Sequence, residues 1–340
     1  MPSNRCIVLK ERPRGIPEPH HFELVSQVLP RLSAGEMIVE TLYLSIDAAL
    51  RGWLNDEPNY SPPVGVGEVV RSLAVGRVVE SRTAEFVPGD LVYGWFGWQT
   101  HCKSTVDRVL RRVDPEQAPV SAAAGVLGIN GLTAWLALHE IGTPRRGETI
   151  VVSTAAGAVG SIVGQLAGHA GCRTVGLTGS REKVKLCVER FGYEAAVNYR
   201  ACGSLDEAVT EHCPGGVDVF FDNAGGYVAD VIVRRMNPFG RIIQCGTLAT
   251  ASWHPVVPQG PRIEREILAR RLRVQGFVIF DHRQRFDEVA ATLARLIRSG
   301  DLTYVEHIYK GLETAPQALA DLYAGRNEGK VLVRIDRESG

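Results

Sequence analysis

From residue 149 to about residue 298, short apolar runs alternate with amphipathic stretches. This alternation is typical of parallel β-strands joined by crossover helices. It predicts helices at 158–170, 181–190, 205–212, 227–236 and 284–298, and strands at 149–153, 173–178, 195–198, 217–221, 241–244 and 273–279. Such a series indicates an α/β, Rossmann-type, doubly wound parallel-sheet domain that binds a nucleotide.

The N-terminal part of the chain has another pattern. Short β-branched runs at 37–44, 76–81 and 90–96 are separated by proline and glycine, which favours a small β-barrel. After the nucleotide-binding pattern ends, the tail again predicts a strand, a helix and a strand, and we expect it to return to the first domain. The predicted domains are a barrel built from 1–125 and 305–340 and a dinucleotide-binding domain at 126–304.

Composition narrows the choice of partner. Hydrophobic residues make up 45% of the chain and charged residues 22%, as in a folded soluble protein. Lysine plus arginine (38) balance aspartate plus glutamate (38), so no overall field attracts nucleic acid or an anionic membrane. We therefore expect a small-molecule partner.

The cysteines and the N-terminus bear on location. The seven cysteines are scattered without a CxxC pair, which fits reduced thiols in the cytoplasm. The N-terminus has no signal-peptide pattern, and no apolar run approaches the length of a membrane span.

A glycine-rich turn, "TAAGAVGSIVGQLAG" at 154–168, follows the first strand of the nucleotide pattern. Set against the dinucleotide fingerprint GxGxxG, it has alanine at the first glycine. Gly157 would let the backbone approach a pyrophosphate, and Gly160 would let the helix pack closely on the strand. Ala158 and Val159 lie between them, where a helix N-terminus presents free N–H groups to phosphates. The alternative is a tight turn with no ligand.

The end of the second strand bears on the choice of coenzyme. An enzyme that prefers NADH usually carries an acid here for the ribose 2′-hydroxyl, but the sequence is "GSREK" at 179–183. Ser180 can donate a hydrogen bond, and Arg181 or Lys183 can neutralise a 2′-phosphate. This pattern favours NADPH, although Glu182 counts against it and a solvated helix turn is the alternative.

Two further strand ends carry polar or small residues where this fold places its ligand. The fourth and fifth predicted strands end in Asn223, Gly225, Gly226, Cys245 and Gly246. Each residue alone is more often a cap or a turn, but together they mark a cofactor path.

In order, "LYLSIDAALRGWL", "GLTAW", "AAGAVGSIVGQLAG", "GSREK", "NYR", "FDNAGG", "RIIQCG", "QGFVIF" and "GRNEGKVLV" resemble the zinc-independent branch of the medium-chain dehydrogenase/reductase superfamily. The similarity is to its prostaglandin reductase and alkenal double-bond reductase group. The resemblance implies a GroES-like barrel, NADPH as hydride donor, reduction of the C=C bond of an α,β-unsaturated ketone or aldehyde, and a homodimer. It also implies cofactor contacts at Thr133, Ser180, Lys183, Tyr199, Asn223, Cys245, Gly246, Phe277, Val278, Ile279 and Asn327.

The chain departs from this family where substrate is expected. Tyrosines of the family correspond to Ala49, Ala251 and Phe280, so three hydroxyls are absent. This predicts a larger, more apolar pocket in which water delivers the proton. Candidate pocket residues are Tyr60, Trp53, Trp95, Trp98, Phe280 and Ala251, with ordinary packing as the alternative for each.

No metal is predicted. Zinc alcohol dehydrogenases share this architecture, but the chain has "GVGEV" where their GHE motif is expected. His101-Cys102 and His139-Glu140 suggest no third ligand. Two alternatives to an ene-reductase remain open from the sequence: a quinone reductase of the same superfamily, and a non-catalytic NADPH-binding protein.

Overall fold

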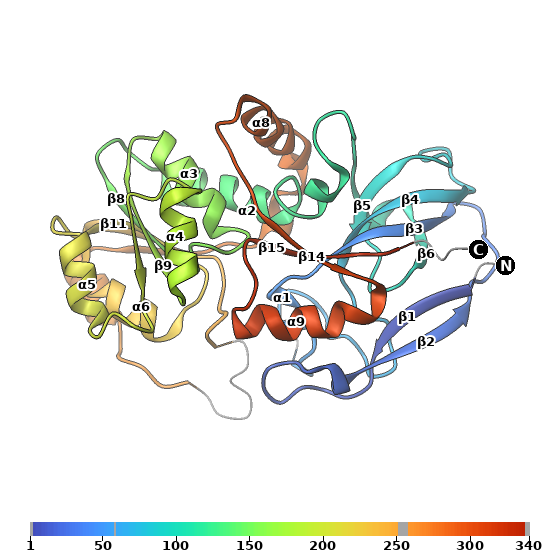
Figure 1. Cartoon of the computed structure of the whole chain (residues 1–340), viewed down its shortest axis with the longest axis horizontal. Coiled ribbons are helices and arrows are strands. Elements are labelled where there is room, and N and C mark those ends of the chain that lie inside the picture. Colours follow the sequence, from blue (N-terminus) through green and yellow to red (C-terminus); the bar gives the residue numbers. More distant parts are fainter. Residues whose placement is uncertain (1–2, 58, 251–257, 337–340) are drawn as a thin grey trace. The chain divides into compact units, whose positions relative to one another are not determined.

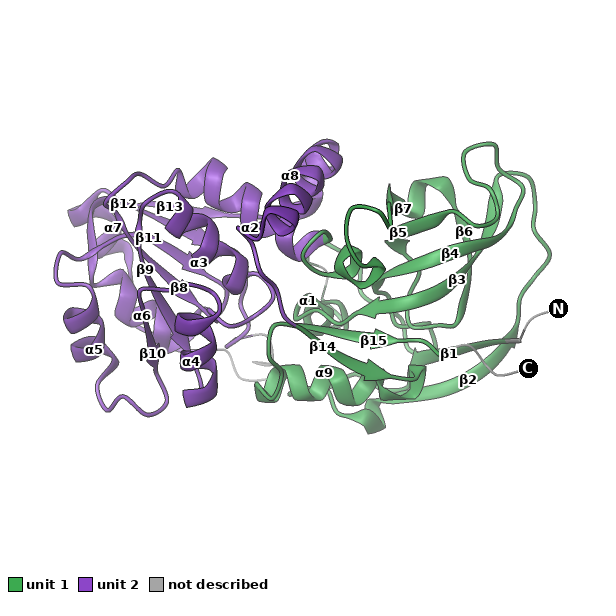
Figure 2. Cartoon of the chain, turned by 45° about the horizontal axis from the view of Figure 1, so that its top comes forward, with its two compact units in different colours: residues 1–128, 306–340 green, residues 129–305 purple. Residues whose placement is uncertain are grey.

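The computed structural model describes residues 3–57, 59–250 and 258–336. The chain divides into two compact units (Figure 2). Unit 1 comprises Met1–Gly128 and Glu306–Gly340, and unit 2 comprises Ile129–Val305. No helix among the described residues has both the length and the apolar character needed to cross a bilayer.

Unit 1 is built mainly from β-structure. Its principal sheet has the order β14-β15-β3-β4-β5-β7, and β6 pairs with β3. The bounds are β3 Glu36–Ser45, β4 Leu73–Ser81, β5 Leu91–Trp95, β6 His101–Thr105, β7 Val109–Arg112, β14 Glu306–Lys310 and β15 Lys330–Arg334. Strand β15 is antiparallel to β3, which brings the C-terminal tail into the N-terminal sheet.

Smaller elements complete unit 1. Strands β1 (Ser3–Leu9) and β2 (Phe22–Val28) form a separate antiparallel pair. Helix α1 spans Ala49–Trp53, and α9 spans Ala315–Ala324 beside β15 (Figure 1).

Unit 2 contains a six-stranded sheet in the order β10-β9-β8-β11-β12-β13, and every neighbouring pair is parallel. Its strands are β8 Thr149–Ser153, β9 Arg173–Thr178, β10 Ala195–Asn198, β11 Val217–Asp222, β12 Met236–Gln244 and β13 Arg273–Gly276. Numbered from β8, the order is 3-2-1-4-5-6, as in the Rossmann fold. The predicted doubly wound sheet is confirmed, and its switch point lies between β8 and β11.

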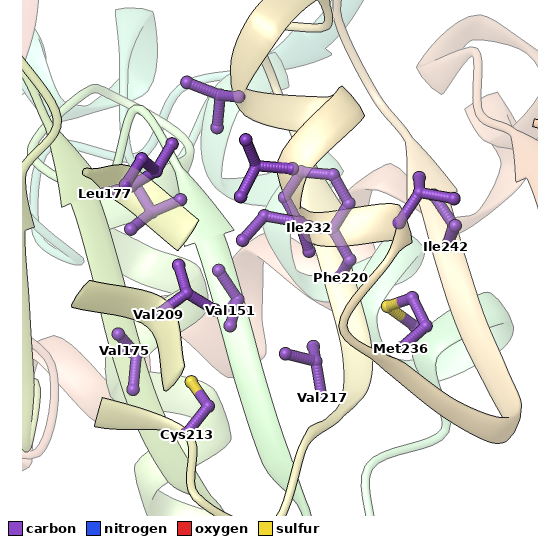
Figure 3. Close-up of a cluster of buried hydrophobic side chains, with 14 of the residues drawn as sticks. Val151, Val175, Leu177, Val209, Cys213, Val217, Phe220, Ile232, Met236 and Ile242 are labelled. Atoms are coloured by element: carbon purple, nitrogen blue, oxygen red, sulfur yellow. The ribbon is translucent and has the colours of Figure 1, made fainter. Parts of the chain in front are cut away.

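In unit 2, helices α3 to α7 connect these strands, α2 precedes β8 and α8 follows β13. They are α2 Ile129–Ala137, α3 Gly160–His169, α4 Arg181–Glu189, α5 Leu205–His212, α6 Gly226–Val233, α7 Glu264–Arg270 and α8 Phe286–Ser299. Val151 of β8, Phe220 of β11 and Ile232 of α6 belong to one cluster of buried side chains (Figure 3). All five residues of β8 are buried, because a central parallel strand is covered on both faces.

Several predicted boundaries were wrong. The helix predicted to reach residue 236 ends at Val233, and β12 begins at Met236 rather than at 241. Pro238 has no N–H to continue a helix, which explains the early end. Strand β13 ends at Gly276, and a 3₁₀ segment begins at Ile279. Helices α1, α2 and α7 and the β1–β2 pair were not predicted.

Candidate functional site

The glycine-rich turn lies at the carboxyl end of β8, beside the switch point of the sheet. Thr154 has a φ of 54°, an uncommon left-handed conformation that turns the chain out of the strand. The carbonyl oxygen of Thr154 accepts a 2.9 Å hydrogen bond from the amide of Gly157. No side chain caps the N-terminus of α3. The amides of Ser161 and Ile162 donate to the backbone carbonyls of Gly157 and Val159, each at 3.0 Å.

Gly160 fills the role predicted for it. A Cβ atom at this position would lie 2.4 Å from the carbonyl oxygen of Thr154 and 2.8 Å from the Cα of Ala155. The start of α3 therefore packs directly on the backbone that leaves β8, and only glycine allows this approach. A Cβ at Gly157 would meet Thr154 at 3.0 to 3.1 Å, a milder contact that leaves its outer side open.

Tyr193 contacts the first residue of α3 and was not predicted from the sequence. Its hydroxyl donates a 2.6 Å hydrogen bond to the carbonyl of Gly160. A Cβ at Gly164 would lie 2.2 Å from its ring. Burial raises the pKa of Tyr193 well above its usual value, so this hydroxyl remains a donor. In the sequence, the available signal was a tyrosine two residues before the strand at 195–198.

The end of β9 gathers the residues predicted for the 2′-phosphate. Ser180 is the N-cap of α4, and its Oγ accepts a 3.2 Å hydrogen bond from the amide of Lys183. The amide of Tyr199 donates to the carbonyl of Thr178 at 3.1 Å, which ties the end of β10 to the end of β9. The backbone amides of Lys183 and Tyr199 are thereby held by the residues that flank Gly179 in the sequence.

Arg200 belongs to this cluster and was also missed. A Cβ on Gly179 would lie 3.2 Å from the Nε of Arg200 and 3.3 Å from the Oη of Tyr199. The Arg200 guanidinium is 5.9 Å from the centroid of the Tyr199 ring. In the sequence, the position of Arg200 directly after Tyr199 was the signal that it belongs to this site. The structure therefore places a guanidinium and a phenol against the glycine that precedes Ser180.

Asp222 organises the ends of β8, β11 and β12. Its carboxylate is fully buried and accepts hydrogen bonds from Ser153 Oγ at 2.8 Å and from Gln244 Nε2 at 3.1 Å. It also accepts from the amides of Ala224 and Gly225, each at 2.9 Å. A carboxylate with this many donors is satisfied although it is buried, and it fixes three neighbouring strand ends.

Asn223, Cys245 and Gly246 are held by the same arrangement. The amide nitrogen Nδ2 of Asn223 donates to the carbonyl of Ser153 at 2.8 Å. The amides of Cys245 and Gly246 donate to the carbonyl of Asp222 at 2.8 and 3.1 Å. Burial raises the pKa of the Cys245 thiol to about 12, so this thiol is not a nucleophile at neutral pH.

The remaining candidate cofactor residues lie at three places. Thr133 is buried in α2 of unit 2. Phe277 follows β13, its amide donates to the carbonyl of Gln244 at 3.1 Å, and Val278 and Ile279 come next. Asn327 lies in unit 1, where its Nδ2 donates to the carbonyl of Gly329 at 3.0 Å.

The candidate pocket residues differ in burial. Trp53 is buried in unit 1 and makes an edge contact with Trp95, their ring centroids 5.4 Å apart. Tyr60 is 55% exposed, whereas Trp98 is fully buried against Phe22. Phe280 lies in unit 2, and Ala251 lies outside the described residues.

Comparison with known proteins gives the family. Residues 5–111 match a family described as the N-terminal domain of oxidoreductase, and residues 158–295 match one described as zinc-binding dehydrogenase. A putative NADP-dependent oxidoreductase of Bacillus subtilis is 37% identical over 99% of both chains. The chain belongs to the medium-chain dehydrogenase/reductase family. Its place is in the alkenal and prostaglandin reductase group, as the sequence predicted.

Other relatives agree with this placement. The NADPH-dependent curcumin reductase of Escherichia coli is 37% identical over 98% of this chain and 97% of its own length. The 2-alkenal reductase (NADP(+)-dependent) of Nicotiana tabacum is 35% identical over 99% of this chain and 98% of its own. The crystal structure of CurA from Vibrio vulnificus in complex with NADPH superposes with a TM-score of 0.92, 35% identity, and coverage of 98% of this chain and 99% of that one.

The zinc named in one family description does not match the donor set here. Among the residues that the structure describes, no group of three or more His, Cys, Asp or Glu side chains is arranged to hold a metal ion. Ser72, which follows the "GVGEVVR" segment, donates its hydroxyl to the carbonyl of Leu73 at 2.8 Å.

Proposed function

We propose that this protein reduces the C=C bond of α,β-unsaturated ketones and aldehydes, with NADPH as the hydride donor and without a metal ion. The observation that carries the proposal is the cluster at the end of β9, where the Arg200 guanidinium and the Tyr199 hydroxyl pack against Gly179 beside Ser180. A 2′-phosphate is the group that separates NADPH from NADH, and cationic and hydroxyl groups bind phosphate well. NADPH-dependent relatives in the same group support the choice.

Each part of the proposed cofactor site has a physical role. Lys183, Tyr199, Arg200 and Ser180 bind the 2′-phosphate, while the uncapped N-terminus of α3 and the backbone at Gly157, Ala158 and Val159 face the pyrophosphate. The strand-end residues fixed by Asp222 line the path of the dinucleotide. The remaining proposed contacts are Thr133, Asn223, Cys245, Gly246, Phe277, Val278, Ile279 and Asn327.

The proposed chemistry follows from the substrate. NADPH supplies a hydride, which adds to the β-carbon of the enone and leaves negative charge on the carbonyl oxygen as an enolate. Hydrogen-bond donors stabilise that charge, and a proton then reaches the α-carbon. Because alanine and phenylalanine stand at positions 49, 251 and 280, where the family has tyrosines, we propose that water delivers this proton.

The test is which carbon of the substrate receives the hydride. Purified protein is incubated with an aliphatic enone and NADPH deuterated at the transferred position, and the product is analysed by NMR. Deuterium at the β-carbon is the expected result. Deuterium at the carbonyl carbon, or turnover of 1,4-benzoquinone with none of the enone, would contradict the proposal.

We also propose that unit 1 is the substrate domain and unit 2 the nucleotide domain of a cytoplasmic homodimer. Strand β13 ends the order of the unit 2 sheet, and all four of its residues are exposed. An exposed edge strand is a template for pairing with another chain. Light scattering after size-exclusion chromatography should give a dimer mass, and a monomer at micromolar concentration would contradict this part.

A further inference from the structure

The segment that follows β13 in unit 2 carries a stack of two rings. Phe277 is the first residue after the strand and is buried, and its ring lies against the imidazole of His282. The two ring centroids are 4.8 Å apart, and the ring planes differ by 17°. His282 has a φ of −113° and a ψ of 23°, which interrupts the 3₁₀ segment Ile279–Arg285. The stack therefore closes a short loop of the chain around Val278 and Ile279.

Glu140 holds the imidazole from another element of the same unit (Figure 2). It lies in the π-helical turn Leu138–Gly142, which continues α2, and its Oε2 is 3.2 Å from Nδ1 of His282. Its other carboxylate oxygen, Oε1, accepts a 3.0 Å hydrogen bond from Nη1 of Arg285. Single π-helical turns are rare and occur frequently at functional sites. One carboxylate thus connects the end of α2 to two side chains of the segment after β13.

The order of the sheet separates this arrangement from the proposed 2′-phosphate site. Strand β13 is four strands from β9, which is about 19 Å at the usual strand spacing of about 4.8 Å. A dinucleotide that binds across the switch point of a Rossmann sheet has one nucleotide on each half of the sheet. The 2′-phosphate belongs to the adenosine of NADPH and is proposed to bind at the end of β9. The segment after β13 therefore belongs to the half that takes the nicotinamide nucleotide.

We propose that His282 and Glu140 are positioning residues for the nicotinamide end of the cofactor. Neither side chain touches NADPH: His282 acts through the ring of Phe277, and Glu140 acts through His282. With these rings fixed, the backbone of Phe277, Val278 and Ile279 keeps one arrangement before the cofactor arrives, and less conformational entropy is lost on binding. This inference rests on the proposed function, because it requires NADPH to occupy the site in unit 2.

Two probes test the assignment without turnover. NADPH spans both halves of the site, whereas 2′,5′-ADP carries the adenosine and the 2′-phosphate but no nicotinamide. His282→Ala removes one ring contact and one polar contact, and should raise the Kd for NADPH about 3-fold to 10-fold while leaving the Kd for 2′,5′-ADP unchanged. Isothermal titration calorimetry measures both constants. An equal rise for the two probes, or no rise for NADPH, would overturn the proposal.

The chain offers a matched control for the loss of a stacked histidine. His139 lies in the same π-helical turn as Glu140, and its ring centroid is 4.2 Å from that of Trp135, which belongs to α2. His139→Ala should change neither Kd, and a selective rise in the Kd for NADPH would contradict the assignment to the segment after β13. The side chains of His282 and Glu140 are 26% and 34% exposed, so their variants should keep the fold, which thermal unfolding checks.

Two further variants test how the residues act. His282→Phe keeps a ring against Phe277 and should recover most of the NADPH binding that His282→Ala loses; no recovery would contradict a role for the stack. If Glu140 acts through His282, the double variant Glu140→Ala/His282→Ala should have the same Kd for NADPH as His282→Ala alone. Additive effects of the two substitutions would show that Glu140 acts independently and would overturn its assignment.

Turnover separates this inference from the proposed function. If the two probes and the variants bind as predicted but no enone is reduced, the positioning role stands and the proposed ene-reductase activity fails. If the enone is reduced with NADPH and His282→Ala binds both probes as the wild type does, the proposed function stands and the positioning role is wrong.

Discussion

The hydroxyl of Tyr193 donates to the carbonyl of Gly160, so a side chain in the loop between α4 and β10 fixes the first residue of α3. The same tyrosine ring occupies the space where a side chain at Gly164 would lie. The orientation of the phosphate-facing end of α3 therefore depends on a residue outside the glycine-rich motif. This contact decides how tightly the proposed pyrophosphate site is held.

Gly164→Ala should destabilise the protein and weaken NADPH binding. The new Cβ would lie 2.2 Å from the Tyr193 ring, and relief requires α3 to move. We expect a loss of about 2 kcal/mol or more in the free energy of unfolding, measured by urea denaturation. Gly168→Ala is the matched control in the same helix. Nothing lies within 4 Å of its Cβ, and a gain of up to about 1 kcal/mol is expected.

The two glycines of the fingerprint should respond differently. Gly160→Ala pushes a methyl group into the Thr154 carbonyl at 2.4 Å and should lower the Tm sharply. Gly157→Ala meets Thr154 only at 3.0 Å or more, so its main effect should be a higher KM for NADPH. Thermal unfolding and initial rates measure the two effects. Equal effects of both variants on Tm would contradict the proposal that one of the two glycines is needed for the ligand rather than for packing.

Removing charge at the end of β9 should reduce the preference for NADPH. Arg200→Gln and Lys183→Gln should each raise the KM for NADPH about tenfold and leave that for NADH nearly unchanged, because only NADPH carries the 2′-phosphate. Lys185→Gln is the control on the helix of Lys183, since the Lys185 side chain is 71% exposed and its ammonium pairs with Glu189. If the variants raised the KM for NADH as much as the KM for NADPH, Lys183 and Arg200 would lie outside the 2′-phosphate site.

Asp222→Asn should loosen the strand ends that line the dinucleotide path. An amide nitrogen cannot accept from the donors that surround this carboxylate, and we expect a loss of about 2 to 4 kcal/mol in stability together with a higher KM for NADPH. Asp218→Asn alters the opposite end of β11, where the carboxylate accepts from the Thr149 amide at 2.8 Å. It should lower stability with little change in KM, and a similar KM effect in both variants would contradict the positioning role of Asp222.

Glu306 should make stability depend on pH. Burial raises its pKa above the usual 4.5, and one carboxylate oxygen is buried without a hydrogen-bond partner. The folded state disfavours ionised Glu306, so the wild type loses stability as pH rises from about 4.5 through the raised pKa of the folded state. Glu306→Gln removes this loss and should gain stability relative to the wild type across that range. Urea denaturation at several pH values measures the difference, with exposed Glu313→Gln as control.

Parallel curves of stability against pH for the wild type and Glu306→Gln would contradict this account.

A neighbouring charge also affects the cost of ionising Glu306. Lys330, which pairs with Glu306 in register across β14 and β15, donates to Asp47 at 2.7 Å, and burial lowers its pKa. The positive charge of Lys330 therefore offsets only part of the cost of ionising Glu306.

Much of the nucleotide domain was predictable because its signals are local. The β8 and β9 runs are apolar and bounded by glycine, so their limits were predicted correctly at 149–153 and 173–178. The fingerprint turn and the Gly179-Ser180 pair at the tip of β9, where an acid is absent, also needed no knowledge of distant residues. Boundaries failed where one residue overrode the periodicity, as at Pro238.

The sequence by itself determined the alternating strands and helices from β8 to β12, the family, and the residue types available to a phosphate. Those properties depend on periodicity, turn chemistry and ordered motifs, all of which lie along the chain. Only the tertiary structure decided which distant groups meet: Tyr193 under Gly160, Arg200 against Gly179, Asp222 between three strands, and Arg71 on Trp53. Such contacts arise from packing between segments far apart in sequence, for which no local pattern exists.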